Sequence, residues 1–171
     1  RDSSVIVVSS AMSGVTNDLV NKSKEISEDF SHEEYDVLVS SGEQVACSLI
    51  AGRLLHKGLK ARSWLAWQIP ILTESTHKHS KINSINKGKI IKYLKKGGIP
   101  IIAGFQGINK AERVTTVGRG GSDLSAIMLS KFFKAQKCVI YTDVEGVYTT
   151  DPNKLSKAKK IKVISYEEML E

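Results

Sequence analysis

The sequence lacks the features that mark membrane and secreted proteins. No apolar run approaches the roughly 20 residues of a membrane-spanning helix, and no charged segment followed by an apolar one opens the chain. Its two cysteines, Cys47 and Cys138, stand in apolar surroundings and do not have the spacing of metal ligands. We therefore interpret them as reduced core residues, and we expect a cytoplasmic protein with no membrane partner.

Two common nucleotide-binding loops are missing as well. The sequence has no Gly-Lys-Ser/Thr at the spacing of a P-loop and no dinucleotide-binding fingerprint. The net charge of +7 would suit a nucleic-acid partner, but the lysines are spread along the chain and no stacking aromatic residues alternate with them. We therefore expect no nucleic-acid partner, and we attribute the charge to a lysine-rich surface and to anionic substrates.

What the sequence does contain is an alternation of strands and helices. At 171 residues, with 41% hydrophobic and 25% charged residues, the chain can form one domain with a substantial core. The alternation is typical of an α/β fold around a parallel sheet, with its loops collected at one edge. The expected strands are Val5–Ser9, Leu59–Gln68, Ile99–Ala103 and Lys137–Tyr141, and the expected helices are Asn17–Asp29, Tyr35–His56, Asn86–Lys96 and two that begin near Ser122 and Ser165.

The segment Thr115–Ala126, TTVGRGGSDLSA, is a glycine-rich loop that leads into a helix. Its glycines let the backbone approach a ligand closely, and the start of a helix offers amide groups and a partial positive charge that favour phosphate. We expect Ser122 or Asp123 to cap that helix. Arg119 supplies a guanidinium suited to an oxyanion, and Asp123 supplies a carboxylate for Mg²⁺ or a cationic group. The alternative is a flexible capped turn without a ligand.

Polar residues stand at two other places where a ligand can bind. The segment Ser10–Asn17 directly follows the first strand, where open α/β sheets place ligands, although Thr16 or Asn17 can also be simple helix caps. Gly42 lies inside an expected helix, where glycine usually marks a boundary or a close approach between elements. Beside it, Glu43 either reaches a ligand amine or is an ordinary solvated helix residue.

The four histidines do not indicate a metal site. His77 and His79 are separated by one residue, but no further ligands have a suitable spacing, so we expect both to be exposed in a strand or loop. His32 and His56 have no catalytic partner that the sequence identifies. We therefore predict no metal site built from protein ligands alone.

Six segments of the chain form an ordered set: SAMSGVTN (10–17), SSGEQ (40–44), AGFQG (103–107), TTVGRGGSD (115–123), YTDVEGVYTTDP (141–152) and ISYEEMLE (164–171). Together they resemble aspartate kinase in sequence, order and approximate spacing, and the resemblance extends over essentially the whole chain. Six ordered motifs are far more specific than one glycine-rich loop. The resemblance implies the amino-acid-kinase fold, a three-layer αβα sandwich with a mainly parallel sheet.

The resemblance also implies an enzymatic reaction. The γ-phosphate of ATP, bound with Mg²⁺, is transferred to the side-chain carboxylate of L-aspartate, which gives 4-phospho-L-aspartate. This reaction opens the biosynthesis of lysine, threonine, methionine and diaminopimelate. Because the attacking carboxylate is already ionised, the protein needs no catalytic base and has to align two anions and neutralise their charge.

The functional residues of the family carry over to matching positions in this sequence. Asp123 matches the aspartate that organises the catalytic centre, and Arg119 matches the arginine that grips the substrate carboxylate. Glu43 is expected to face the substrate amino group. The other implied substrate-binding residues are Ser10, Thr16, Gly120, Gly121 and Ser122, and the implied ATP-binding residues are Thr142, Asp143, Tyr148 and Asn153.

The chain departs from the family pattern in three ways. The family's opening strand, with Lys-Phe-Gly-Gly and a lysine that stabilises the transferring phosphate, is absent, and Asn153 stands where the family usually has arginine. Beyond Glu171 the family continues into a further nucleotide-binding segment and, usually, paired regulatory ACT domains. We therefore interpret residues 1–171 as a partial catalytic domain, truncated at both ends and without ACT domains. We expect it to be poorly active alone and to form a homodimer in the full-length enzyme.

Two other interpretations stay open at this point. Another kinase of the same superfamily would phosphorylate glutamate, acetylglutamate or a nucleoside monophosphate, although SAMSGVTN and SSGEQ resemble the substrate-side segments of aspartate kinase. Alternatively, a non-catalytic module has kept the fold and lost the lysine. A Lys-Phe-Gly-Gly strand encoded upstream would indicate truncation rather than degeneration.

Overall fold

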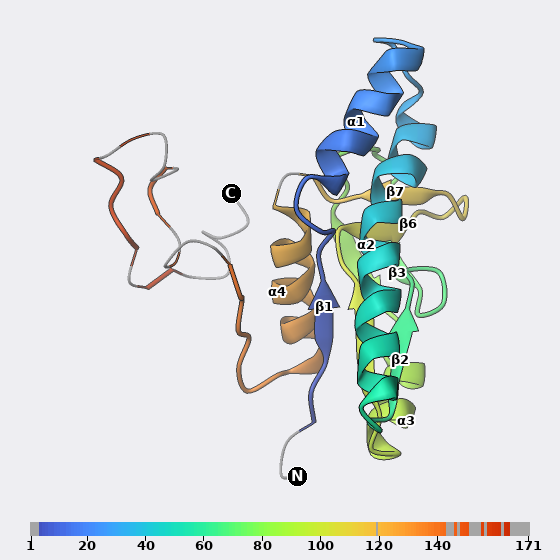
Figure 1. The fold of residues 1–171 in the computed structure, drawn as a ribbon, viewed down its shortest axis with the longest axis vertical. Helices are drawn as coiled ribbons and strands as arrows, with labels where there is room; N and C mark the ends of the chain where they lie inside the picture. The colour runs from blue at the N-terminus through green and yellow to red at the C-terminus, as the bar shows by residue number, and fades with distance from the viewer. Residues whose placement is uncertain are drawn as a thin grey trace. The chain divides into compact units, whose positions relative to one another are not determined.

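The computed structural model describes residues 4–118, 120–142, 146, 148–150, 155, 157–161 and 163–164. The chain divides into two compact units, Arg1–Gln136 and Lys137–Glu171, and each is described by itself. The helices and strands of the first unit are labelled in Figure 1. They are β1 (Val7–Ser9), α1 (Val15–Ile26), α2 (His32–His56), β2 (Ala61–Trp64), β3 (Ile71–Thr73), β4 (Ile82–Ile85), α3 (Gly88–Lys95), β5 (Ile99–Ala103), β6 (Gln106–Ile108), β7 (Val114–Thr116) and α4 (Gly121–Phe133).

A three-stranded parallel sheet forms the middle layer of the first unit. Strand β5 lies between β1 and β2, with Val7 paired to Ile101 and Trp64 paired to Ile102. Because successive strand side chains point to opposite faces, Ile101 packs with buried residues of α2, whereas Ile102 packs with buried residues of α3 and α4. Helices therefore cover both faces of the sheet, which confirms the three-layer αβα architecture (Figure 1).

The first unit also contains a second, mixed sheet with the strand order β4-β3-β6-β7. This sheet was not predicted from the sequence. Strand β3 pairs antiparallel with β4 and parallel with β6, and β6 pairs antiparallel with β7. Polar side chains are buried along it: Gln106, Thr115 and Thr116 are fully buried, and Thr73 Oγ1 lies 2.6 Å from Thr115 Oγ1. These strands are short and partly polar inside, so they lack the apolar pattern by which a strand is predicted.

Helix α2 is continuous through Gly42, so the predicted alternative of a helix boundary there is wrong. A Cβ on Gly42 would lie 2.9 Å from Ala11 Cβ and 3.2 Å from Val15 Cγ1. Gly42 therefore confirms the other predicted alternative, a close approach between two elements of the structure. Because the loop after β1 and the start of α1 pack directly on the middle of α2, Glu43 is held inside a helix and next to that loop.

The remaining helix predictions agree with the structure within a few residues. Helices α1, α2, α3 and α4 occur where they are expected, and Gly97, with φ +71°, follows α3 as a C-terminal glycine. The first strand is shorter than predicted, and only Ser9 in it is fully buried, because β1 is at the edge of the described sheet. None of the described helices combines the length and the apolar character needed to cross a membrane.

The second unit does not contain the strand that the sequence predicts at 137–141. Residues 137–142 are not in a strand, and the side chains of Val139 and Tyr141 are 52% and 94% exposed. An apolar run shows that a segment suits a pleated surface, but a strand forms only when it pairs with a partner edge. Among the described residues of this unit, an antiparallel bridge joins Tyr148 and Lys160. The helix predicted to begin near Ser165 lies outside the described residues.

Candidate active site

A pocket of about 510 Å³ lies next to the loops that leave β1 and β5, entirely within the first unit. Loops at the carboxyl ends of parallel strands are where open α/β sheets bind ligands, so the predicted edge of the sheet is the one that carries the pocket. The pocket brings together the predicted residues Ser10, Thr16, Glu43, Gly120, Gly121, Ser122 and Asp123. Arg119, which is also predicted to bind substrate and precedes Gly120 in the glycine-rich loop, lies outside the described residues.

Glu43 is buried against this pocket, with only 3% of its surface exposed. Its Oε1 accepts hydrogen bonds from the Ala11 amide at 3.1 Å and from Ser122 Oγ at 3.5 Å. Its Oε2 is buried and has no hydrogen-bond partner among the described residues. Burial raises the pKa of Glu43, although the hydrogen bond from Ala11 opposes this shift. The alternative of a solvated helix glutamate is therefore wrong.

The glycine-rich loop enters α4 through its backbone and not through a side-chain cap. Gly120 occupies the N-cap position with φ +68°, a left-handed conformation that suits glycine, and no side chain caps the helix. The prediction that Ser122 or Asp123 caps α4 is wrong, because these residues lie two and three positions after the N-cap residue, inside the first turn of the helix. Their side chains instead line the pocket, where partial desolvation raises the pKa of Asp123.

The start of α1 follows the same pattern. Gly14, with φ +82°, is the N-cap residue, and no side chain caps the helix. Thr16 and Asn17 lie in the first helical turn and line the pocket, so the alternative that they are only caps is wrong. Two helix starts, those of α1 and α4, thus contribute polar side chains to one pocket.

Sequence reasoning missed the segment between β3 and β4, which also reaches the pocket. The carboxylate of Asp36 is fully buried in α2 and accepts hydrogen bonds from His77 Nδ1 at 2.7 Å, the Lys78 amide at 3.1 Å and Thr116 Oγ1 at 2.6 Å. These bonds hold the segment in place, so that Lys78 and His79 line the pocket. The Lys78 ammonium also lies 4.6 Å from the centre of the Tyr35 ring.

The two histidines of this segment therefore differ. His79 is exposed, as predicted, but the prediction for His77 is wrong, because only 10% of its side chain is exposed. The reason is its contact with Asp36, which is remote in the sequence and gives no local signal.

The residues predicted to bind ATP belong to the second unit. Thr142 is exposed and Tyr148 is half-buried, with Tyr148 in the bridge to Lys160. Asp143 and Asn153 lie outside the described residues. The nucleotide-binding assignments of these four residues thus stay predictions.

Comparisons with known proteins place the whole chain within one group. A model of the amino acid kinase family matches residues 1–171. The aspartokinase of Rickettsia conorii is 52% identical over 176 residues, covering 100% of this chain and 43% of that protein. The structure of E. coli aspartokinase III in complex with aspartate and ADP has a TM-score of 0.70 and 28% identity, covering 86% of this chain and 34% of that one.

A second solved structure gives the same result. The aspartate kinase from Synechocystis has a TM-score of 0.70 and 36% identity, covering 91% of this chain and 26% of that one. The chain therefore spans less than half the length of these three aspartate kinases.

Proposed function

Because this chain belongs to the amino acid kinase family, we propose that it forms the substrate-binding part of an aspartate kinase. The proposed reaction transfers the γ-phosphoryl group of ATP to the side-chain carboxylate of L-aspartate. The relatives named aspartokinase match the chain over its full length, which supports the resemblance indicated by the six segments. The E. coli structure with aspartate and ADP adds support from a protein of the same fold.

The observation that carries this proposal is the unpartnered oxygen of Glu43. A buried carboxylate is costly unless a cation or hydrogen-bond donors satisfy it, and Oε2 has neither among the described residues. The α-ammonium group of an amino acid supplies both a positive charge and up to three N–H donors. We therefore assign Glu43 to the substrate amino group, with Ser122 holding the other carboxylate oxygen in place.

The start of α4 in the same pocket is suited to anions. The first turn of α4 has no side-chain cap, so its amide groups are open to a ligand, and Lys78 adds a positive charge. Arg119, Gly120 and Gly121 are proposed to hold the substrate carboxylate at this helix start. A carboxylate nucleophile needs alignment and charge neutralisation more than it needs a base, and these are the properties of such a surface.

Asp123 is proposed to organise the catalytic centre. Among the described residues there is no cluster of three or more His, Cys, Asp or Glu side chains that would bind a metal ion. Mg²⁺ commonly binds through one or two carboxylates together with substrate phosphates and water, so the single carboxylate of Asp123 is compatible with Mg-ATP. When bound, Mg²⁺ would neutralise charge on the phosphate oxygens.

Several further features follow from this assignment as proposals. Thr142, Asp143, Tyr148 and Asn153 would contact the nucleotide. The product, 4-phospho-L-aspartate, would feed the synthesis of lysine, threonine, methionine and diaminopimelate in the cytoplasm, and the full-length enzyme would be a homodimer. Because the chain spans less than half of its relatives, we propose that it binds substrate but turns over slowly by itself.

Thermal denaturation with ligands tests this function. L-Aspartate at a hundred times its Kd should stabilise the chain by about 2.7 kcal/mol, which is roughly 5–10 °C for a chain of this size. L-Glutamate and UMP, the substrates of alternative kinases, serve as controls and should give no shift. A shift with glutamate or UMP but not with aspartate would overturn the assignment. Turnover close to that of a full-length aspartate kinase would contradict the proposed slow reaction.

A further inference from the structure

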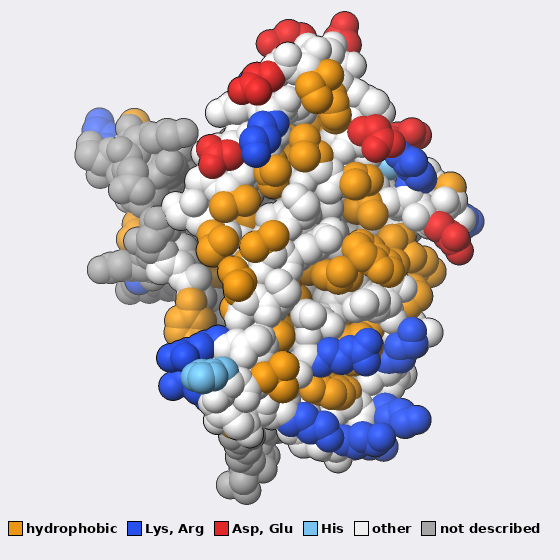
Figure 2. Space-filling model, turned by 45° about the vertical axis from the view of Figure 1, so that its right-hand side comes forward, with side chains coloured by type: hydrophobic (Ala, Val, Ile, Leu, Met, Phe, Trp, Pro, Cys, Tyr) orange, Lys and Arg blue, Asp and Glu red, His pale blue; other side chains and the backbone are white. Residues whose placement is uncertain are grey.

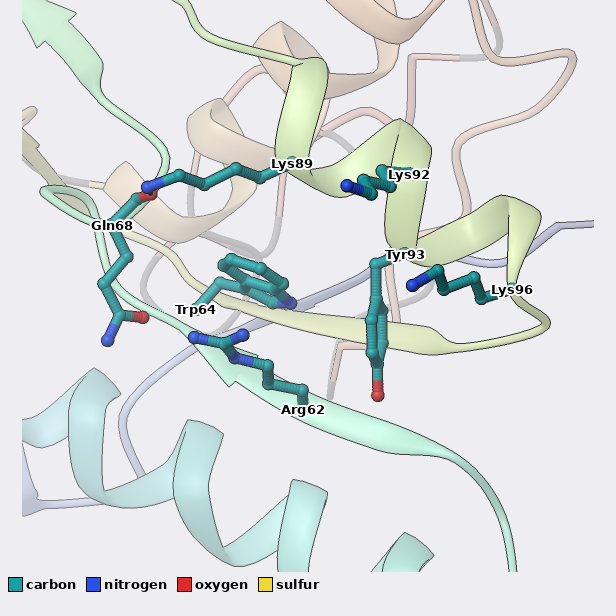
Figure 3. Close-up of a pocket in the computed structure, with 7 residues that line it drawn as sticks. All are labelled: Arg62, Trp64, Gln68, Lys89, Lys92, Tyr93 and Lys96. Carbon is teal, nitrogen blue, oxygen red and sulfur yellow. The ribbon is translucent and has the colours of Figure 1, made fainter.

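A second pocket, of about 340 Å³, lies between β2 and α3 and shares no lining residue with the candidate active site (Figure 3). Two aromatic side chains, Trp64 and Tyr93, form its walls. No acidic residue lines it, although acidic residues are common elsewhere on the surface. Its basic lining residues are Arg62, Lys89, Lys92 and Lys96.

The local sequence explains why these side chains converge. Arg62 and Trp64 are two residues apart in β2, so they share one face of the strand. Along α3 and its C-cap, the lining residues Lys89, Lys92, Tyr93 and Lys96 follow the i, i+3, i+4, i+7 spacing of one helix face. Figure 2 shows lysine and arginine side chains gathered over the lower part of the drawn face, the end at which α3 lies in Figure 1.

Most of this positive charge is not neutralised within the protein. The Lys89 ammonium donates to the Gln68 carbonyl at 2.8 Å. In contrast, Arg62, Lys92 and Lys96 have no carboxylate partner among the described residues, and the Arg62 guanidinium lies 4.0 Å from the centre of the Trp64 ring. Like charges held this close repel one another, so the pocket is favourable for a multiply charged anion.

A second, independent observation points to a ligand in the same place. Trp64 is only 4% exposed, and its indole Nε1 is buried without a hydrogen-bond partner among the described residues. In Figure 3 this nitrogen faces the side of the pocket on which Lys92 and Tyr93 lie. The Tyr93 and Trp64 rings form a T-shaped pair with 5.9 Å between ring centres, and the π face of an aromatic ring is only a weak hydrogen-bond acceptor. An anionic oxygen in the pocket would satisfy the indole N–H.

We propose that this pocket binds a small, multiply charged anion that carries phosphate or carboxylate groups. The indole N–H of Trp64 donates to one of its oxygens, and Arg62, Lys92 and Lys96 neutralise its charge. The pocket shares no lining residue with the pocket proposed to bind aspartate, and the proposal does not depend on the assignment of the aspartate and ATP sites.

Fluorescence of Trp64 allows a direct test. The chain has two tryptophans, so Trp67→Phe leaves Trp64 as the only one, and the candidate active site has no tryptophan among its described lining residues. Pyrophosphate and citrate represent phosphate and carboxylate ligands, and titration with at least one of them should give a saturable change in emission with one site per chain. ATP and a single-stranded oligonucleotide complete the series. No change with pyrophosphate or citrate would overturn the proposal, as would binding of the oligonucleotide alone.

Matched variants locate the binding. Lys92→Glu should weaken binding of the responding anion by about tenfold or more, because it reverses a charge that lines the pocket. Lys95→Glu makes the same change on an exposed residue of α3 that does not line the pocket, and should alter affinity by less than about twofold at physiological ionic strength. Equal losses would indicate a general surface potential, which would contradict a defined site.

The variant Trp64→Phe tests the indole itself. It keeps an aromatic ring and removes the N–H donor, so calorimetry should show affinity for the same anion weakened several-fold to about tenfold. Unchanged affinity would show that the indole does not bind the ligand and would overturn this part of the proposal.

Discussion

The two pockets described above each contain a buried polar atom that has no hydrogen-bond partner among the described residues. One of these atoms is an acceptor and the other is a donor. In the candidate active site the atom is Glu43 Oε2, an acceptor that carries negative charge. In the pocket beside α3 it is Trp64 Nε1, a donor that is surrounded by cations. Since buried polar groups are nearly always paired in folded proteins, each unpaired atom supports the charge that we propose for the ligand of its pocket.

The candidate active site also contains an internal comparison between two buried carboxylates of α2. Asp36 is fully satisfied by His77, Lys78 and Thr116, whereas Glu43 is satisfied at one oxygen only. A satisfied buried carboxylate contributes to the fold, and an unsatisfied one is a cost that a ligand can offset. The two residues lie seven positions apart on the same helix, so their substitution should affect stability in opposite directions.

The largest expected effect is the loss of aspartate binding in Glu43→Gln. Removing one charge from a buried charge pair should cost about 4 kcal/mol, or roughly a thousandfold in Kd. The ligand-free variant should melt a few degrees higher than the parent chain, because it no longer buries an unpaired carboxylate. Calorimetry and thermal denaturation measure the two effects. Glu25→Gln, on the exposed surface of α1, is the control and should change neither; aspartate binding that survives Glu43→Gln would refute the role of Glu43.

Asp36→Ala is expected to lower the stability of the chain, in contrast to Glu43→Gln. It leaves His77, the Lys78 amide and Thr116 without their common acceptor, so the free energy of unfolding should fall by about 3 kcal/mol and the thermal midpoint by roughly 6–12 °C. Chemical denaturation provides the measurement. The exposed Asp29→Ala serves as a control with a change below about 0.5 kcal/mol. A stability loss no larger than that of the control would mean that this network does not hold the segment.

The sequence predicted the candidate site better than it predicted the parts that hold it. Glycine-rich loops, helix starts and residues after strands are local signals, and Ser10, Thr16, Glu43, Ser122 and Asp123 do meet in one pocket. The contact of Asp36 with His77 joins residues that are distant in the sequence, and no local pattern reports it. Lys78 was missed for the same reason, since the hydrogen bonds of His77 and of the Lys78 amide to Asp36 hold this segment at the pocket.

The fold shows the same division between local and non-local information. The alternating helix and strand patterns correctly predicted an α/β fold around a parallel sheet, and the resemblance to aspartate kinase correctly implied its αβα layers. The predicted strand at 137–141 was wrong because its apolar pattern reports suitability for a sheet and not the presence of a partner. The cap predicted at Ser122 or Asp123 was wrong, as was the alternative that Thr16 or Asn17 is only a cap, because glycines with positive φ, Gly120 and Gly14, already turn the chain into each helix.

A smaller effect should come from Gly42→Ala, which tests how Glu43 is positioned. The added methyl group would lie 2.9 Å from Ala11 Cβ, so the loop after β1 must move, at a cost of about 2 kcal/mol. Gly52→Ala is a matched control on the same helix, with no atom within 4 Å of the added group, and should stabilise the chain by about 0.5–1 kcal/mol. Denaturation of both variants gives the two values, and equal values would contradict the close approach.

The smallest expected effect is the pH dependence of aspartate binding. It tests whether Glu43 must be ionised to bind the substrate. Burial raises the pKa of Glu43, so at low pH its carboxyl group is protonated in the free chain and must lose a proton to bind an ammonium group. Below that raised pKa, affinity should fall by about tenfold, or 1.4 kcal/mol, for each pH unit, and above it affinity should be constant.

The stability of the free chain should change with pH in the opposite sense. A raised pKa in the folded state means that the folded chain holds its proton more tightly, so the contribution of Glu43 to stability is present below the ordinary value of 4.5 and is lost as the pH rises through the raised pKa. The difference in melting temperature between Glu43→Gln and the parent chain should therefore vanish below pH 4.5 and grow as the pH rises.

Asp123 lines the same pocket and also has a raised pKa, so Glu43→Gln is needed to isolate the Glu43 titration. A difference that stays constant over this range would show that Glu43 is not the titrating group.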